Sequence, residues 1–204
     1  MYSYLALGDS YTIGEQVVYA ENFPNQAVQL LRGRKVDVGD PVIVATTGWT
    51  TDELQAALRE HPVQGTFSWV SLLIGVNNQY RGRSLENFRT EFEQLLLQAI
   101  HFAGGDAGHV FVLSIPDWGV TSFAESRDRV AIGREIDAFN QVCREVSKAH
   151  HCAFLEITES TRQHGHLAEY MAPDGLHPSG KEYGIWAHQL AQLVEMTLAH
   201  GIKK

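Results

Sequence analysis

The stretch Tyr4-Leu5-Ala6-Leu7-Gly8-Asp9-Ser10 is a short apolar run that stops at a glycine and two polar residues. An apolar run of this length without polar alternation is typical of a strand that is buried on both faces of a parallel sheet. Gly, Asp and Ser are favoured in turns, so they mark the end of the strand. We therefore predict a buried strand over residues 4–7, with Ser10 in the turn that follows it.

The pattern of an apolar run followed by a helical stretch recurs along the chain. Further runs are predicted as strands at residues 42–45, 69–74, 110–113 and 153–156. Stretches with apolar residues at helical spacing alternate with them at residues 22–32, 50–58, 84–102, 129–150 and 179–200. This alternation predicts a parallel sheet with helices on both faces, a three-layer α/β/α sandwich. We expect five strands in the flavodoxin-like order 2-1-3-4-5.

Two of the predicted helices begin with capping signals. Asn22 is followed by Phe23-Pro24, and a first helical turn tolerates proline. Thr50 and Glu53 have the spacing of a capping box. The connection over residues 157–173 shows no periodicity and is longer than most connections. We expect this stretch to be irregular, either a lid over a site or simple loop packing.

Length and composition limit the possible function classes. The 204 residues fit one domain, 1–204. With 16 Lys and Arg against 24 Asp and Glu, the formal charge is −8, so no basic field attracts phosphate backbones. We expect no nucleic-acid partner.

The cellular setting is also an expectation from composition. Cys143 and Cys152 form no disulfide framework or CxxC pair, which favours two buried thiols in a reducing compartment. No stretch approaches the roughly 20 apolar residues of a membrane span, and the N-terminus carries no basic leader. We expect a cytoplasmic protein without a membrane span.

Glycine and polar clusters follow the predicted strands directly. They lie at residues 8–10, 48, 75–78 and 116–118, and His177 lies in the long connection after the fifth strand. The carboxyl ends of parallel strands meet at one edge of an open sheet, and ligands bind in the crevice there. We therefore expect these clusters to form a single site.

Ser10, His177 and Asp174 are the candidates for the chemistry of this site. A serine hydroxyl is a weak nucleophile at neutral pH and needs a base within hydrogen-bonding reach, which a third group must orient. The Asp-x-x-His spacing lets a short turn bring Asp174 under its own histidine. These residues therefore predict nucleophilic catalysis by a serine.

Attack on an ester carbonyl creates an oxyanion, which needs hydrogen-bond donors already aimed at it. We assign three donors: the backbone N–H of Ser10, the backbone N–H of Gly48 and the side-chain amide of Asn77. A glycine lets a substrate approach the backbone closely, and an asparagine donates without carrying charge.

The blocks Gly8-Asp9-Ser10-Tyr11-Thr12, Gly48, Gly75-Val76-Asn77 and Asp174-Gly175-Leu176-His177 occur in the order shown by GDSL-type (SGNH) hydrolases. The chain resembles this family over nearly its whole length. The resemblance implies a flavodoxin-like α/β/α fold and a serine esterase, lipase, thioesterase or carbohydrate deacetylase without metal or organic cofactor. It also implies that Ser10 is the nucleophile and a donor, that Gly48 and Asn77 are the other donors, and that Asp174 and His177 complete the triad.

The sequence departs from two related patterns. The third block of the family usually reads Gly-x-Asn-Asp, whereas Asn78 stands here in place of the acid, which removes a carboxylate that could support neighbouring loops. The second glycine of the Gly-x-Ser-x-Gly elbow is missing around Ser10, which disfavours the α/β-hydrolase fold.

Five side chains are candidates for the walls of a substrate pocket. They fall in loops on the predicted active-site side, where aromatic and thioether groups could hold an acyl chain or a sugar. They are Trp118, Tyr80, Phe123, Tyr170 and Met171. Simple loop packing is the alternative. His164 and His166 could ligate a metal, but no carboxylate or thiol stands at ligand spacing beside them, so we expect no metal site.

The leading hypothesis is a serine hydrolase that cleaves short-chain carboxylic esters through an acyl-enzyme, with a small-molecule ester as its substrate. A carbohydrate O-deacetylase or a thioesterase needs the same triad and remains an alternative. A non-catalytic flavodoxin-like binding module and a degenerate hydrolase recruited as a scaffold are the alternatives of another class.

Overall fold

Five parallel strands form the central sheet of the computed structural model, which describes residues 1–201. The last three positions of the predicted domain 1–204 lie outside the described residues. The strand order is β2-β1-β3-β4-β5, so the predicted order is confirmed. The strands are β1 (Tyr4–Gly8), β2 (Val42–Ala45), β3 (Trp69–Leu73), β4 (Val110–Leu113) and β5 (Ala153–Leu155).

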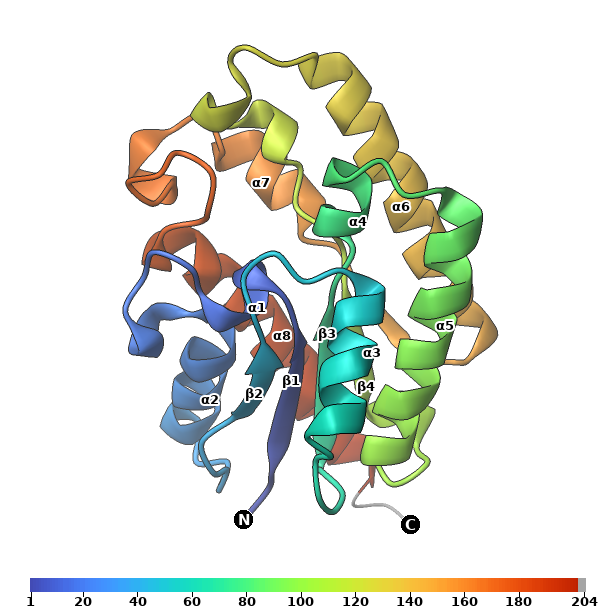
Figure 1. Cartoon of the computed structure of the whole chain (residues 1–204). Helices are drawn as coiled ribbons and strands as arrows, with labels where there is room; N and C mark the ends of the chain where they lie inside the picture. The colour runs from blue at the N-terminus through green and yellow to red at the C-terminus, as the bar shows by residue number, and fades with distance from the viewer. Residues whose placement is uncertain (202–204) are drawn as a thin grey trace.

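Helices cover both faces of the sheet (Figure 1). The α-helices are α1 (Ser10–Ile13), α2 (Phe23–Gly33), α3 (Thr51–Glu60), α4 (Val76–Tyr80), α5 (Leu85–Phe102), α6 (Arg129–Ala149), α7 (Thr158–His164) and α8 (Gly180–Gly201). Helices α2 and α8 pack together on one face, while α3, α5 and α6 cover the other. The predicted α/β/α layering is confirmed.

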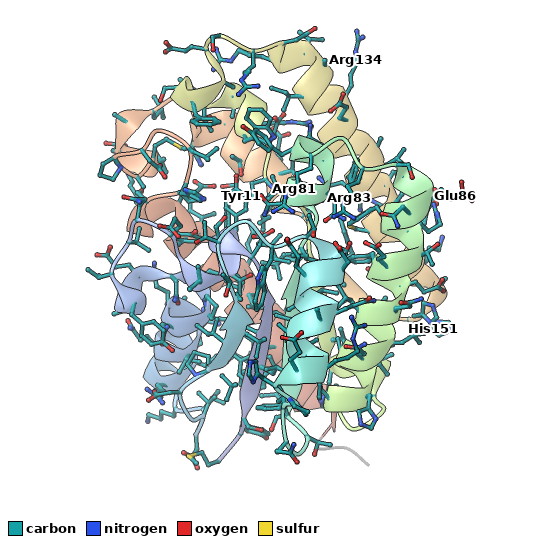
Figure 2. The ribbon with its side chains drawn as sticks, in the orientation of Figure 1. Tyr11, Arg81, Arg83, Glu86, Arg134 and His151 are labelled. Atoms are coloured by element: carbon teal, nitrogen blue, oxygen red, sulfur yellow. The ribbon has the colours of Figure 1, made fainter. Side chains whose placement is uncertain are left out.

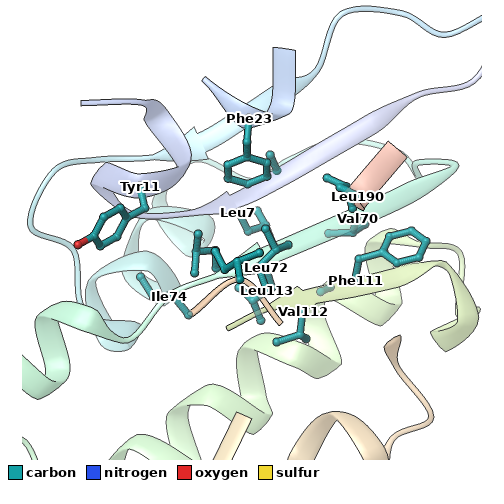
Figure 3. Close-up of a cluster of buried hydrophobic side chains, with 14 of the residues drawn as sticks. Leu7, Tyr11, Phe23, Val70, Leu72, Ile74, Phe111, Val112, Leu113 and Leu190 are labelled. Carbon is teal, nitrogen blue, oxygen red and sulfur yellow. The ribbon is translucent and has the colours of Figure 1, made fainter. Parts of the chain in front are cut away.

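The core lies on both faces of the central strands, which explains why their sequences are apolar without alternation. All residues of β1 and β3 are buried, and Leu7 of β1 pairs in register with Leu72 of β3. Figure 3 shows these two side chains beside Leu113 of β4, with Phe23 of α2 in the same cluster. The sheet therefore holds the loops at its carboxyl edge on a rigid base.

The helix starts follow the predicted capping signals. The side chain of Asn22 accepts a hydrogen bond of 3.0 Å from the backbone N–H of Asn25 at the start of α2. Thr50 and Glu53 form the expected capping box at α3. Both predictions are confirmed because capping depends on residues that are close in sequence.

Three short helices, α1, α4 and α7, lie where loops were expected, at the carboxyl edge of the sheet (Figure 1). The prediction of an irregular stretch over residues 157–173 is wrong, because α7 begins at Thr158 and ends at His164. The start of α7 is fixed by Ser114, the residue directly after β4, whose hydroxyl accepts hydrogen bonds from the backbone N–H groups of Ile157 and Thr158. A seven-residue helix held by such contacts is too short to produce a clear periodicity.

Two further sequence expectations concern burial. Cys143 and Cys152 are both buried and unpaired, as predicted. Within residues 1–201, none of the helices combines the length and the apolar character that a membrane crossing requires.

Candidate active site

Ser10 is held at the junction of β1 and α1. It is the first residue of α1 and is separated from β1 only by Asp9, the capping residue. A carboxylate oxygen of Asp9 accepts a hydrogen bond of 3.0 Å from the backbone N–H of Tyr11. A Cβ atom on Gly8 would overlap the side chain of Thr12 and the backbone carbonyl of Leu73, so the turn requires glycine at this position.

The Asp9 carboxyl group is buried beside the candidate nucleophile. Burial raises its pKa to about 7, although the hydrogen bond from Tyr11 acts in the opposite direction. Its second oxygen, Oδ2, has no hydrogen-bond partner among the described residues. An unpartnered buried oxygen disfavours the ionised form. The structure therefore places a readily neutralised acid directly before Ser10.

Ser10, His177 and Asp174 form one hydrogen-bonded chain. Nε2 of His177 lies 3.0 Å from Oγ of Ser10, and Nδ1 lies 2.6 Å from Oδ2 of Asp174. A proton on Nδ1 directed at the carboxylate leaves Nε2 free to accept from the serine hydroxyl. The arrangement can therefore move a proton from Ser10 to His177.

The loop between Asp174 and His177 holds the carboxylate in its ionised form. Oδ1 of Asp174 accepts backbone hydrogen bonds of 2.9 Å from Leu176 and 3.0 Å from His177. Partial burial raises the pKa of Asp174, but the hydrogen bonds from the His177 side chain and from these two N–H groups outweigh that effect and lower it. The carboxylate stays charged and can stabilise an imidazolium on His177.

Gly48 and Asn77 lie around the same opening as Ser10. Gly48 adopts a φ of +84°, which a glycine tolerates at little cost, in the connection after β2. Asn77 lies in the first turn of α4, and its Nδ2 donates a hydrogen bond of 3.0 Å to the carbonyl of Trp49. An amide nitrogen carries two protons, so one N–H of Asn77 remains for a ligand.

Asn78 connects α4 to the start of α3. Its side chain is fully buried; Oδ1 accepts from the backbone N–H of Thr51 at 3.1 Å, and Nδ2 donates to Oγ1 of Thr51 at 2.7 Å. The Thr51 hydroxyl in turn donates to Glu91 on α5. The amide at position 78 therefore supports the neighbouring loops through both of its polar atoms. A carboxylate, that of Glu91, joins the same network through the Thr51 hydroxyl.

A cavity of about 230 Å³ opens at Ser10. The four candidate residues Ser10, Gly48, Asn77 and His177 line it, together with Tyr11, Thr47, Val76, Tyr80, Trp118, Phe123 and Leu176. Trp118 packs edge-on against Tyr80 and Phe123, with ring centroids 5.5 Å and 6.0 Å apart. Its indole N–H is satisfied by Gln79 at 2.8 Å, so the aromatic wall is held in place. The interior is largely apolar.

Two of the predicted pocket residues lie elsewhere. The ring of Tyr170 stacks on His164 at 4.3 Å, and Met171 lines a separate depression next to Ser122. Met171 forms an antiparallel bridge with Pro178. This pairing directs residues 170–171 along the chain that follows His177 and away from the cavity. The expectation that Tyr170 and Met171 line the pocket is therefore wrong, whereas Tyr80, Trp118 and Phe123 do line it.

Several lining residues were not predicted. Tyr11 and Leu176 are direct neighbours of Ser10 and His177 in the sequence, and this proximity could have identified them. Arg81, which does not line the cavity, was also missed: its Nη2 donates to the carbonyl of Gly48 at 2.6 Å. An isolated arginine after an asparagine-rich turn carries no recognisable motif, so only the fold reveals this contact.

The histidines considered for a metal have other surroundings. Nδ1 of His164 lies 3.0 Å from the buried carboxylate of Glu182. In the part of the chain that the structure describes, no group of three or more His, Cys, Asp or Glu side chains is placed to hold a metal ion.

Solved structures with a similar fold share little sequence with this chain. A lipase/acylhydrolase from Enterococcus faecalis is 20% identical with a TM-score of 0.74, covering 97% of this chain and 96% of that one. Axe2, an acetylxylan esterase from Geobacillus stearothermophilus, is 17% identical with a TM-score of 0.72, covering 95% and 94%. The psychrotrophic esterase EstA from Pseudoalteromonas sp., in a form inhibited by monoethylphosphonate, is 14% identical with a TM-score of 0.70, covering 98% and 100%.

Sequence comparison supplies the family directly. No curated protein matches the chain. The sequence model of the GDSL-like lipase/acylhydrolase family, however, matches residues 6–185, which include every residue of the hydrogen-bonded chain and of the cavity. The chain belongs to the GDSL-like lipase/acylhydrolase family and is a carboxylic ester hydrolase.

Proposed function

We propose that this protein hydrolyses esters of short-chain carboxylic acids, with Ser10 as the nucleophile. The observation that carries the proposal is the hydrogen-bonded chain from Asp174 through His177 to Ser10, which ends in a small, apolar cavity. The chain belongs to a hydrolase family, which argues against the alternative of a non-catalytic binding module.

In the proposed reaction, Oγ of Ser10 attacks the carbonyl carbon of the ester while its proton passes to Nε2 of His177. The carbonyl oxygen becomes an oxyanion and receives hydrogen bonds from the N–H of Ser10, the N–H of Gly48 and the amide of Asn77. The C–O bond to the alcohol then breaks, and the alcohol leaves with the proton from His177.

Water completes the cycle. It attacks the acyl-enzyme and gives a proton to His177, and the second oxyanion collapses to release the acid while Ser10 regains its proton. Asp174 orients the imidazole and balances its charge in both half-reactions. The lowered pKa of Asp174 supports this role, because a neutral carboxyl could not stabilise the imidazolium.

The size of the cavity supports short acyl groups. At about 230 Å³ it lies below the roughly 300–1,000 Å³ of pockets for drug-sized ligands. Trp118 and Phe123, whose rings pack edge-on, line it together with the apolar side chain of Leu176. Acetyl to butyryl chains match such a space better than long fatty acyl chains do.

The leaving group is a separate question, because the triad acts on an ester, a thioester or an acetylated sugar in the same way. The fold neighbour Axe2 is an acetylxylan esterase, which supports including acetylated xylan among the substrates tested. Acyl-CoA tests the thioesterase alternative.

The test is a panel of p-nitrophenyl esters from acetate to palmitate, run with acetylated xylan and acyl-CoA. We expect the highest kcat/KM with acetate or butyrate, and loss of activity and of phosphonate labelling in Ser10→Ala. Ser84→Ala, which removes a hydroxyl that caps α5 and does not line the cavity, is the control. Undiminished turnover by Ser10→Ala, or a preference for palmitate, would contradict the proposal.

A further inference from the structure

We propose that Arg81 is a positioning residue for the oxyanion donors. It holds the turn of residues 48–50, here called the Gly48 segment, against α4, so that the N–H of Gly48 and the amide of Asn77 keep one fixed relative geometry. The inference rests on the proposed function, because it takes these two groups as the donors to the oxyanion.

The guanidinium of Arg81 joins two parts of the same turn. Its Nη2 donates to the carbonyl of Gly48 at 2.6 Å, and its Nη1 donates to Oε1 of Glu53 on α3 at 3.1 Å. Figure 2 shows Arg81 near the carboxyl edge of the sheet, above α3. A planar guanidinium makes two directed hydrogen bonds of this kind, which a lysine ammonium cannot reproduce in the same geometry.

Glu53, the partner of Arg81, also binds Thr50, two residues after Gly48 in the same turn. Its Oε2 accepts from the backbone N–H of Thr50 at 2.8 Å. Arg81 and Glu53 therefore fix the turn before and after Trp49. Because glycine has no Cβ, the backbone at Gly48 has many accessible conformations, so outside contacts must select the observed one, with its φ of +84°.

Helix α4 provides the common frame for both donors. Asn77 and Arg81 are four residues apart, which places them on the same side of the helical turn, and the N–H of Arg81 donates to the carbonyl of Asn77 at 3.0 Å. Asn77 holds the carbonyl of Trp49 while Arg81 holds that of Gly48. Two successive carbonyls of the Gly48 segment are thus bound to one short helix.

The effect we infer is geometric more than electrostatic. The Arg81 side chain is 42% exposed, so solvent weakens the interaction of its charge with an oxyanion. A displaced donor, by contrast, loses its hydrogen bond in the transition state, and displacements of about 1 Å can lower rates by about 100-fold. Arg81 therefore acts through Gly48 and needs no contact with substrate.

The chain contains a matched control at Arg83. It is the same residue type two positions later, and its Nη2 also pairs with an acid of α3, Asp52, at 3.4 Å, but it makes no hydrogen bond to the Gly48 segment. Figure 2 labels both arginines, with Arg83 closer to α5. Arg83→Ala removes one charge and one ion pair to α3, as Arg81→Ala does, without releasing Gly48.

The experiment compares Arg81→Ala, Arg81→Lys and Arg83→Ala with the wild type, using p-nitrophenyl acetate. We expect kcat of Arg81→Ala to fall by about 10- to 100-fold with little change in KM, and Arg81→Lys to recover only part of this loss. Arg83→Ala should keep the wild-type kcat. Melting temperatures measured on the same samples check that all variants are folded.

Chemical rescue separates positioning from a general structural role. Guanidinium at a low, non-denaturing concentration should raise kcat of Arg81→Ala several-fold and leave Arg83→Ala unchanged. A wild-type kcat in Arg81→Ala, an equal loss in both alanine variants, or a loss confined to KM would overturn the inference. If the wild type itself hydrolyses no ester and Ser10 takes no phosphonate label, the proposed function fails instead.

Discussion

Asn77 uses its two amide protons for different purposes. One N–H is bound to the carbonyl of Trp49, which sets the orientation of the side chain, and the other remains for a ligand in the cavity that Asn77 lines with Ser10. In the proposed mechanism, a donor that is already oriented loses little freedom when the oxyanion forms, which would be the basis of its effect on rate.

At the residue scale, we predict that Asn77→Ala lowers kcat by about 10²–10³-fold with little change in KM, because the donor acts mainly in the transition state. Steady-state kinetics with p-nitrophenyl acetate measure this. Asn87→Ala is the control, since Asn87 is exposed on α5 and its amide donates to Glu91. An unaltered kcat in Asn77→Ala would remove that side chain from the oxyanion site.

A second prediction at this scale concerns the pH dependence of stability. Asp9 ionises near 3.8 when unfolded, but burial raises its pKa to about 7 in the folded protein. Between these values the folded state retains a proton that the unfolded state has released, so this group lowers the free energy of unfolding as pH rises. Above about pH 7 the carboxyl group is ionised in both states, so the destabilisation by the buried charge no longer changes with pH.

Asp9→Asn keeps an acceptor for the N–H of Tyr11 and removes the ionisation. We therefore expect the variant to gain thermal stability relative to the wild type between about pH 4 and about pH 7, and this gain to level off at higher pH. Melting curves over this range measure it. A difference between the two proteins that is the same at every pH would show that Asp9 titrates normally.

Among the elements, α4 has a role that its short length does not suggest. Its residues Asn77 and Asn78, and Arg81 directly after its last residue, each bind a different part of the chain between Gly48 and Thr51. Helix α4 also follows β3 directly, and β3 is fully buried. The helix therefore connects the rigid sheet to the loop that carries Gly48, the proposed donor.

The direction of the hydrogen bonds at Asn78 leads to a prediction for this element. The Thr51 hydroxyl has one proton, which it donates to Glu91, so it can only accept from position 78. In Asn78→Asp the introduced carboxylate competes with Glu91 for this proton. We expect a loss of about 1–3 kcal/mol in the free energy of unfolding, because one buried acceptor loses its donor.

Glu91→Gln should reverse the direction of the bonds and restore part of the stability of Asn78→Asp, since a glutamine amide can donate to Thr51. Urea unfolding of the wild type, the two single variants and the double variant measures this coupling. Additive losses in the double variant would mean that the three side chains do not act as one network.

At the scale of the whole molecule, the sheet brings distant segments to one edge. Ser10, Asn77 and His177 lie after β1, after β3 and in the connection from β5 to α8, yet they line one cavity. Parallel strands make this possible because all their carboxyl ends lie at the same side of the sheet. The core that supports the strands encloses both cysteines as well.

The packing of the whole molecule predicts unreactive thiols. Burial raises the pKa of Cys152 to about 12 and that of Cys143 above its usual range, and the thiolate is the reactive form. We expect neither cysteine to react with Ellman's reagent in the native protein and both to react in denaturant. Rapid reaction of one thiol in the native state would indicate local opening of the core.

The order of strands and helices was predictable from the sequence because it depends on local patterns. Buried strands show as apolar runs, and helix starts show as capping residues such as Asn22 and Thr50, within a few positions of the element they begin. The candidate residues Ser10 and His177 were predictable because turn clusters after parallel strands share one edge, and because their blocks resemble those of a known family.

Other features were decided only by tertiary structure. Helix α7 depends on hydrogen bonds from its backbone to Ser114, far away in sequence, and the turn of Met171 toward Pro178 removes that side chain from the cavity. The contact of Arg81 with Gly48 likewise joins residues on different connections. Such contacts have no local signature, because they depend on which surfaces the sheet brings together.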